Sequence, residues 1–272
     1  MTDLDDELPA WSLRRDDPRA GGLPRTWPHR IDRDWAWGGS DGAQVRVAIV
    51  DSGVDGAHEL VGGVTRAVAV EVADGEARVV EDSVGDVAGH GTACAGIVRS
   101  MAPACELWSV RVLGPGSRGG ATALLAGLRW AVAQRCEVVN LSLSTPRRET
   151  AALLHEIADE AYFAGSIIVA AAHNLDVRSY PWRFASVISV ASHDGADPFE
   201  FLYNPQPPVE ILARGVDVEI AWLGGVRIIA AGNSFAAACV SGVCALILAK
   251  HPGLTPFQLK TVLRETATNM EV

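Results

Sequence analysis

The sequence predicts an α/β domain with a doubly wound, mainly parallel central sheet and helices on both faces. Short, apolar, β-branched runs such as VRVAIV at residues 45–50 suit strands that are buried on both faces of a parallel sheet. These runs alternate along the chain with longer segments of helical periodicity, which implies helices that cover the sheet. With 272 residues, 49% of them hydrophobic, the chain is long and apolar enough to bury one sizeable core.

The expected elements follow one another in βα order. Strands are predicted at 45–50, 107–113, 138–143, 167–171 and 187–191, with shorter β segments near 209–212 and 226–230. Helices are predicted within 27–38 and at 90–101, 122–134, 149–163, 234–250 and 255–266. Gly165 suits the C-terminal stop of the helix 149–163, and Thr255-Pro256 suits the start of the last helix. We expect one domain over residues 26–272, preceded by an N-terminal extension or arm at 1–25.

Charge and hydropathy exclude several classes of partner. The net charge is -10 and no basic stripe stands out, so nucleic acid is not an expected partner. The apolar runs at 166–172 and 239–249 are too short to span a bilayer, so no membrane is expected. The N-terminus, MTDLDDELPAWSLRRDD, is acidic and polar where a signal peptide is basic and then apolar. We therefore expect a cytoplasmic protein.

The cysteines and the acidic residues do not predict a metal site. Five cysteines occur with no CxxC pair, so we interpret them as reduced thiols packed like small hydrophobic residues, with a disulfide or metal site as the alternative. Acids cluster weakly at residues 81–86 and 194–197, which we interpret as scattered surface charges. No metal and no cofactor is assigned; calcium is possible, but no recognisable site supports it.

Three segments carry residues suited to catalysis. Asp51-Ser52-Gly53 directly follows a predicted buried strand, at the edge where α/β active sites form. Gly89-His90-Gly91-Thr92 opens a helix and leaves the histidine accessible. Gly232-Asn233-Ser234 opens another helix, where backbone N–H groups favour negative charge. Taken singly, the first segment is also explained by an ordinary turn and the third by a helix-capping serine. A lone histidine is more often structural, but the glycines beside His90 leave it no apolar face to pack on, which favours a functional role.

Taken together and in this order, the segments resemble the subtilase family. VAIVDSGVDGAHEL is similar to its Asp motif, GHGTACAGIV to its His motif and GNSFAAACVSGVCALIL to its Ser motif. VRVLGPGSRGG, NLSLS and AAHN extend the resemblance over residues 31–266. It implies a subtilisin-like fold and a serine endopeptidase that works through an acyl-enzyme intermediate.

The resemblance implies a role for each of four residues. Ser234 attacks the scissile carbonyl, while His90 takes its proton and later delivers it to the leaving amine. Asp51 holds the His90 tautomer and stabilises the imidazolium. Asn174, at the end of IIVAAAHN, matches the family's oxyanion donor and acts with the backbone N–H of the serine.

The family holds substrate as an added β-strand, and two segments here match its walls. The implied substrate contacts are Arg118, Gly119 and Gly120 on one side and Ser142, Leu143 and Ser144 on the other. The alternative for GSRGG is an ordinary loop. Asn140, at the start of NLSLS, is expected to be structural.

The sequence departs from the family pattern at four positions. Asn233 stands in place of a threonine, and its side chain is still able to donate a hydrogen bond to the oxyanion region or to the turn. Phe235 and Ala238 replace Met and Pro, and both suit tolerated packing changes. His173 stands where the family usually has Gly, so we expect it to contact substrate and to narrow the pocket for the residue before the scissile bond. The alternative is that His173 faces solvent.

Several biological roles fit these features. We expect a specific intracellular processing protease, for example one that removes a leader in peptide maturation, with a peptide or protein as its partner. A general or regulatory intracellular protease is the alternative, and a catalytically silent peptide-binding module is the alternative from another class. We expect residues 1–25 to be a disordered or packing arm, with an inhibitory segment as the alternative. The oligomeric state does not follow from the sequence.

Overall fold

A computed structural model describes residues 12, 28–117 and 119–270. Contacts divide the chain into two units, residues 1–31 and residues 32–272, and the fold and the site lie in the second. The predicted extension at 1–25 lies outside the described residues except for Ser12, so its role stays a prediction.

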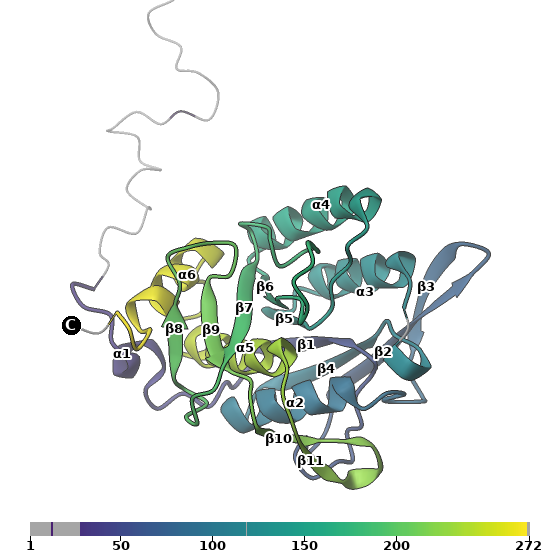
Figure 1. The fold of residues 1–272 in the computed structure, drawn as a ribbon, viewed down its shortest axis with the longest axis horizontal. Coiled ribbons are helices and arrows are strands. Elements are labelled where there is room, and N and C mark those ends of the chain that lie inside the picture. Colours follow the sequence, from purple (N-terminus) through teal and green to yellow (C-terminus); the bar gives the residue numbers. More distant parts are fainter. Residues whose placement is uncertain (1–11, 13–27, 118, 271–272) are drawn as a thin grey trace, which may run out of the picture. The chain divides into compact units, whose positions relative to one another are not determined.

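A nine-stranded sheet forms the centre of the domain, with the strand order β3-β2-β4-β1-β5-β6-β7-β9-β8 (Figure 1). Pairing is parallel from β2 to β9, and only β3 and β8 at the two edges pair antiparallel. The strands are β1 (Arg46–Asp51), β2 (Arg66–Ala73), β3 (Glu76–Glu81), β4 (Glu106–Arg111), β5 (Val138–Leu141), β6 (Ile167–Ala171), β7 (Ile188–His193), β8 (Phe201–Tyr203) and β9 (Ile211–Arg214).

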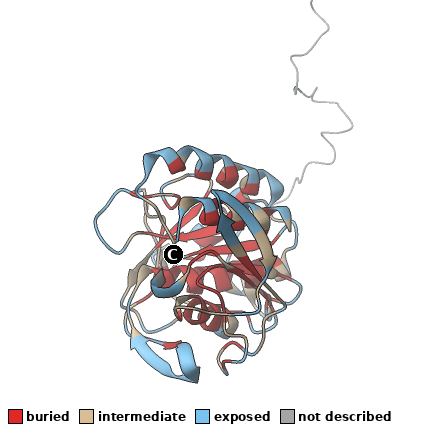
Figure 2. Ribbon diagram, turned by 90° about the vertical axis from the view of Figure 1, so that its right-hand side faces the viewer, coloured by how far each residue is buried: buried red, intermediate tan, exposed pale blue. Residues whose placement is uncertain are grey.

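Helices cover both faces of this sheet, which confirms the predicted doubly wound α/β class. In Figure 1, α3 (Ala121–Ala133) and α4 (Arg148–Ala164) lie above the sheet, and α2 (His90–Met101) and α5 (Asn233–Lys250) lie below it. The short α1 (Arg33–Trp37) and the last helix, α6 (Pro256–Glu265), complete the set of α-helices in the described ranges. Figure 2 shows the buried residues gathered in the strands and on the helix faces turned toward them.

The core helix α5 corrects one expectation. By length and composition alone it is able to cross a bilayer, since its 18 residues have a mean hydropathy of 1.5. The expectation that every apolar run is too short is therefore wrong here. However, 83% of this helix is buried inside the domain, where it packs against β5, β6, β7 and β9, as a core helix does.

Most predicted elements are present. The edge strands β2, β3 and β8 and the strand β10 (Val218–Ala221), which pairs with β11 (Arg227–Ala230), were not predicted. The outer half of β2 and most of β3 are exposed and carry charged residues, so they lack the continuous apolar runs of the central strands. The predicted helix within 27–38 forms only at Arg33–Trp37, where the Asp32 side chain accepts a hydrogen bond from the Trp35 N–H.

The cysteine prediction is confirmed, and the interpretation of the acids is wrong in part. All five cysteines are buried free thiols. Asp82 is not a scattered surface charge, because its fully buried carboxylate pairs with the Arg111 guanidinium at 2.9 Å. Burial acts to raise the pKa of Asp82, but hydrogen bonds from Arg111 and from backbone N–H groups outweigh it and lower that pKa.

Candidate active site

The candidate site forms at the carboxyl edge of the sheet, where β1 ends. Asp51 is the last residue of β1 and is fully buried. Its backbone carbonyl accepts a hydrogen bond at 2.8 Å from the N–H of Val112, the residue that follows the neighbouring strand β4. Its Oδ1 accepts the N–H of Ser52 at 2.7 Å. The strand therefore holds the carboxylate in a fixed place, beside the first turn of α2.

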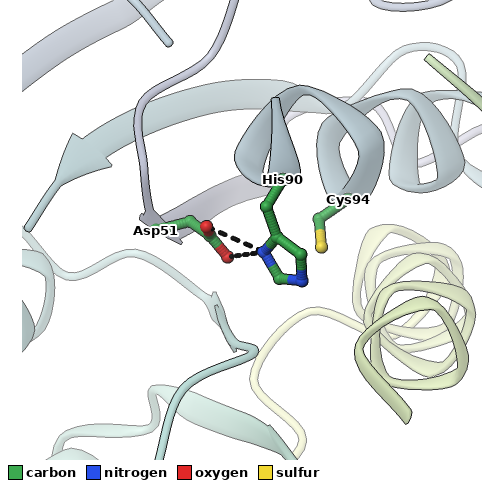
Figure 3. Close-up of side chains that lie close together, drawn as sticks. All are labelled: Asp51, His90 and Cys94. Atoms are coloured by element: carbon green, nitrogen blue, oxygen red, sulfur yellow. Dashed lines mark hydrogen bonds and ion pairs between the residues drawn. The ribbon is translucent and has the colours of Figure 1, made fainter. Parts of the chain in front are cut away.

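His90, the first residue of α2, pairs with that carboxylate (Figure 3). Its Nδ1 lies 2.9 Å from Oδ1 and 2.8 Å from Oδ2 of Asp51. A carboxylate only accepts, so Nδ1 carries the proton and Nε2 of the neutral ring is left with a free lone pair. The charge of Asp51 raises the pKa of His90 against the opposing effect of burial, and Asp86 adds to the rise.

Close backbone packing explains the glycines around His90. A Cβ at Gly91 would collide with the backbone oxygen of Gly53, so only glycine lets α2 come this near to β1. Gly89 has a φ of 90° and caps the start of α2. A Cβ there would lie 2.9 Å from the ring of Trp222. The glycines on either side of His90 thus allow two close contacts, with Gly53 and with Trp222, that fix the position of the histidine.

Asp86 anchors the turn before His90, a role that the sequence interpretation missed. Its Oδ1 accepts hydrogen bonds from the Ser52 hydroxyl at 2.8 Å, the Ala88 N–H at 2.9 Å and the Gly89 N–H at 2.8 Å. Its Oδ2 accepts the Thr92 N–H at 2.8 Å and the Thr92 hydroxyl at 2.5 Å. This carboxylate therefore joins the end of β1 to both sides of the histidine. The available signal was an acid four residues before the histidine of a glycine-rich turn.

Ser234 is the second residue of α5 and lies where three elements meet. Its backbone oxygen accepts a hydrogen bond from the Ser142 hydroxyl at 3.3 Å, just after β5. The Cys94 thiol of α2 lies 4.0 Å from the same oxygen. The next side chain, Phe235, packs against the His90 ring with centroids 6.2 Å apart. Ser234 is 7% exposed.

The serine and the histidine are not hydrogen-bonded to each other in the part of the chain that the structure describes. Figure 3 shows the second ring nitrogen of His90 turned away from Asp51. Hydrogen bonds between catalytic groups often shorten only when substrate binds. The geometry thus contains the Asp51–His90 pair together with a serine at the start of a helix, where backbone N–H groups favour developing negative charge.

Asn174 and Asn233 form a pair beside Ser234. Asn174 Oδ1 accepts the backbone N–H of Asn233 at 3.0 Å. The Asn233 side chain accepts the N–H and the hydroxyl of Ser192, both at 2.9 Å, and donates to the Ala172 carbonyl at 3.0 Å. Of the two roles considered for Asn233, its side-chain contacts support fixing the turn. They tie the start of α5 to the ends of β6 and β7.

The structure places the predicted substrate contacts at different points of this edge. Gly119 and Gly120 are exposed immediately before α3, and Arg118 lies outside the described residues. Ser142, Leu143 and Ser144 are half-buried after β5. Asn140 donates to Ser142 at 3.3 Å and accepts from Ser241 of α5 at 3.1 Å, in line with the expected structural role.

His173 is half-buried and lines a hollow next to Asn174. The cavity measures about 350 Å³, and its walls include Leu175, Trp182 and Val209. His173 Nδ1 accepts the Leu175 N–H at 3.0 Å, which turns that edge of the ring toward the following loop. The side chain is therefore held by its own turn and borders open space.

One group in the described ranges has ligand atoms close enough together to hold a metal ion. A carboxylate oxygen of Asp51, a ring nitrogen of His90 and the sulfur of Cys94 all lie within 4.8 Å of one another. Figure 3 shows the three side chains. Burial raises the pKa of the Cys94 thiol well above its usual value, so the free thiol is protonated at neutral pH. Asp51 and His90 are already paired with each other. The donor set therefore suits proton transfer better than metal binding.

Comparison with known proteins places the chain among proteases of one type. A sequence profile of the subtilase family matches residues 42–272. Subtilisin DY from Bacillus licheniformis is 31% identical over 250 residues, covering 85% of this chain and 86% of that protein. Subtilisin from Bacillus pumilus is 30% identical over 247 residues, covering 85% and 86%. The crystal structure of a cold adapted subtilisin-like serine proteinase superposes with a TM-score of 0.68 at 29% identity over 83% of each chain.

Proposed function

The chain belongs to the subtilase family and is a subtilisin-type serine peptidase, and on that premise we propose that Asp51, His90 and Ser234 form its charge-relay set. The observation that carries this assignment is the contact of His90 Nδ1 with both oxygens of the Asp51 carboxylate, at 2.9 and 2.8 Å. The contact fixes the tautomer in which Nε2 is the base.

The proposed reaction follows from that tautomer. His90 Nε2 takes the proton of the Ser234 hydroxyl as its oxygen attacks the scissile carbonyl, and the proton then passes to the leaving amine. Water then hydrolyses the acyl-enzyme: His90 takes a proton from the water as it attacks and returns that proton to the Ser234 oxygen as the acyl group leaves. Asp51 stabilises the imidazolium that forms at each step.

Asn174 is proposed as the donor to the tetrahedral oxyanion. Its Oδ1 is engaged by the Asn233 N–H, so the Nδ2 amide remains to donate. The backbone N–H of Ser234, at the start of α5, is the second donor. Donors that are fixed before the reaction give strong electrostatic stabilisation, and the contact with Asn233 supports such a role for Asn174.

The substrate is proposed to be an extended peptide that lies between residues 118–120 and residues 142–144. We propose that His173 restricts the residue before the scissile bond, because it borders the hollow beside Asn174. A restricted pocket suits a dedicated processing protease, for example one acting in peptide maturation, more than a degradative one. We further propose that the reaction requires no cofactor or metal and that the protein acts in the cytoplasm.

The proposal is tested by incubating the full chain with a quenched peptide library and reading the new termini by mass spectrometry. The wild-type protein is expected to cleave, and Ser234→Ala to lose about 10⁶ in turnover. Ser100→Ala on α2 is the matched control, since its hydroxyl bonds only to its own helix, and it should keep full activity. Cleavage that survives in Ser234→Ala would contradict the assignment.

A further inference from the structure

The hollow that His173 borders lies beside the proposed nucleophile. Its lining includes Asn174, the proposed oxyanion donor, and Asn233, the residue directly before Ser234. The same two asparagines are hydrogen-bonded to each other, so this side of the hollow is fixed to the start of α5. A substrate side chain that enters the hollow therefore belongs to a residue next to the scissile bond.

The loop at 175–183 supplies a large part of the lining of the hollow, and contacts within the domain hold it in place. Thr145 and Tyr180 exchange two backbone hydrogen bonds, both of 2.9 Å, across an antiparallel bridge. Trp182 is 7% exposed, and its indole N–H donates to the Ser179 hydroxyl at 2.9 Å. The loop is thus joined to the residues that follow the proposed substrate wall at 142–144.

Two arginines of this loop line the hollow, and neither is paired with a carboxylate within the described ranges. Arg178 Nε donates to the Tyr180 hydroxyl at 3.0 Å, and its guanidinium carbon lies 6.0 Å from the centre of that ring. The guanidinium carbon of Arg183 lies 5.1 Å from the Trp182 ring centre. A guanidinium that rests on a ring keeps N–H donors at its edge for another partner.

The charge of this lining differs from that of the chain as a whole. The chain has a net charge of -10, whereas Asp176 is the one acid beside the two arginines among the described residues of the lining. A carboxylate is the group that the planar guanidinium binds best, through parallel N–H donors. Among the side chains of a peptide, those of Glu and Asp carry this group.

We propose that the hollow receives an acidic side chain, so that the protein cleaves after Glu or Asp, with Arg178 and Arg183 as the specificity-determining residues. This inference rests on the proposed peptidase function and deepens it, because it names the substrate class of the same site. His173 restricts the space beside Asn174, and the two arginines select the charge of the residue that fills it.

The test compares quenched peptides that differ only at the residue before the cut, which is Glu in one and Gln in the other. The two side chains have nearly the same shape, so the ratio of their kcat/KM values isolates the charge. The wild-type protein is expected to favour Glu about fivefold at low ionic strength, which is the scale of two exposed ion pairs. The ratio should approach one at about 1 M salt, where the screening length is about 3 Å.

A variant with both Arg178→Gln and Arg183→Gln should cleave the two peptides with a ratio of about one. Each single variant should lower the ratio to about twofold, so the test holds even where the double variant does not fold. The matched control carries Arg78→Gln and Arg129→Gln, which remove the same charge from exposed positions on β3 and α3. It should keep the wild-type ratio.

A wild-type ratio near one overturns the inference, as does a Glu preference that persists in the single and double variants. A ratio that falls equally in the control overturns it as well, because the preference then reflects the net charge of the protein. A wild-type protein that cleaves neither peptide but cleaves others of the quenched library overturns the inference alone. Cleavage of no peptide at all refutes the proposed function itself.

Discussion

The side-chain oxygen of Asn174 accepts the backbone N–H of Asn233, one residue before Ser234, at 3.0 Å. This contact orients the amide so that its nitrogen remains free to donate. Asn174 therefore has two possible roles: its side-chain nitrogen donates to the oxyanion, or its side-chain oxygen only fixes the turn before Ser234.

Two substitutions at position 174 distinguish these explanations. Asn174→Asp keeps the oxygen that binds the Asn233 N–H but loses the donor, whereas Asn174→Ala loses both. We expect kcat to fall by about 10²–10³ in each variant, with little change in KM. Steady-state kinetics on a quenched peptide provides the measurement. Activity near the wild-type level in Asn174→Asp would show that the residue only fixes the turn.

Removing the acid of the charge relay should cost less than removing the nucleophile. Asp51→Asn leaves the shape of the site but no longer selects the Nδ1–H tautomer, so we expect kcat to fall by about 10⁴. The measurement is single-turnover cleavage, with circular dichroism to confirm folding. A loss below tenfold in a folded variant would remove Asp51 from the mechanism.

The Asp86 carboxylate should influence both the position and the titration of His90. His90 acts as a base when neutral, so kcat/KM rises with pH through its pKa, which Asp51 and then Asp86 raise above the ordinary histidine value. Asp86→Asn should lower that pKa, move the acid limb to lower pH and reduce kcat by about 10² through misplacement of the ring.

Asp82→Asn is the control for this prediction. Its carboxylate pairs with Arg111 and accepts the backbone N–H of Val84, whereas Asp86 binds Ala88, Gly89 and Thr92 on either side of His90. It should lower the thermal midpoint and leave the acid limb in place. If the two variants give the same pH profile, Asp86 has only a structural role.

Substitution of His173 is expected to change which residue the protein accepts before the scissile bond. His173→Gly opens the hollow beside Asn174, so we expect it to accept larger residues before the scissile bond. Profiling both proteins with one peptide library measures the change. A wild-type profile as broad as that of the variant would mean that the His173 side chain does not limit the pocket.

Sequence reasoning predicted the parts of this protein that depend on local pattern. The apolar runs of β1 and β6 and the glycines around His90 each have a physical signature in the chain. The edge hairpin β2–β3 did not, because its exposed strands carry mixed charged and apolar residues.

The role of Asp86 was also beyond sequence reasoning, because it depends on five donors from four residues that meet only in the folded protein.

The central claim is that Ser234 is a nucleophile activated by His90, and covalent labelling tests it most directly. A fluorophosphonate probe reacts only with an activated serine, so peptide mapping of the labelled wild-type protein should place one adduct on Ser234. His90→Ala should label far more slowly, and Ser234→Ala should not label. A folded wild-type protein that stays unlabelled, or that carries its adduct on another residue, would contradict the account.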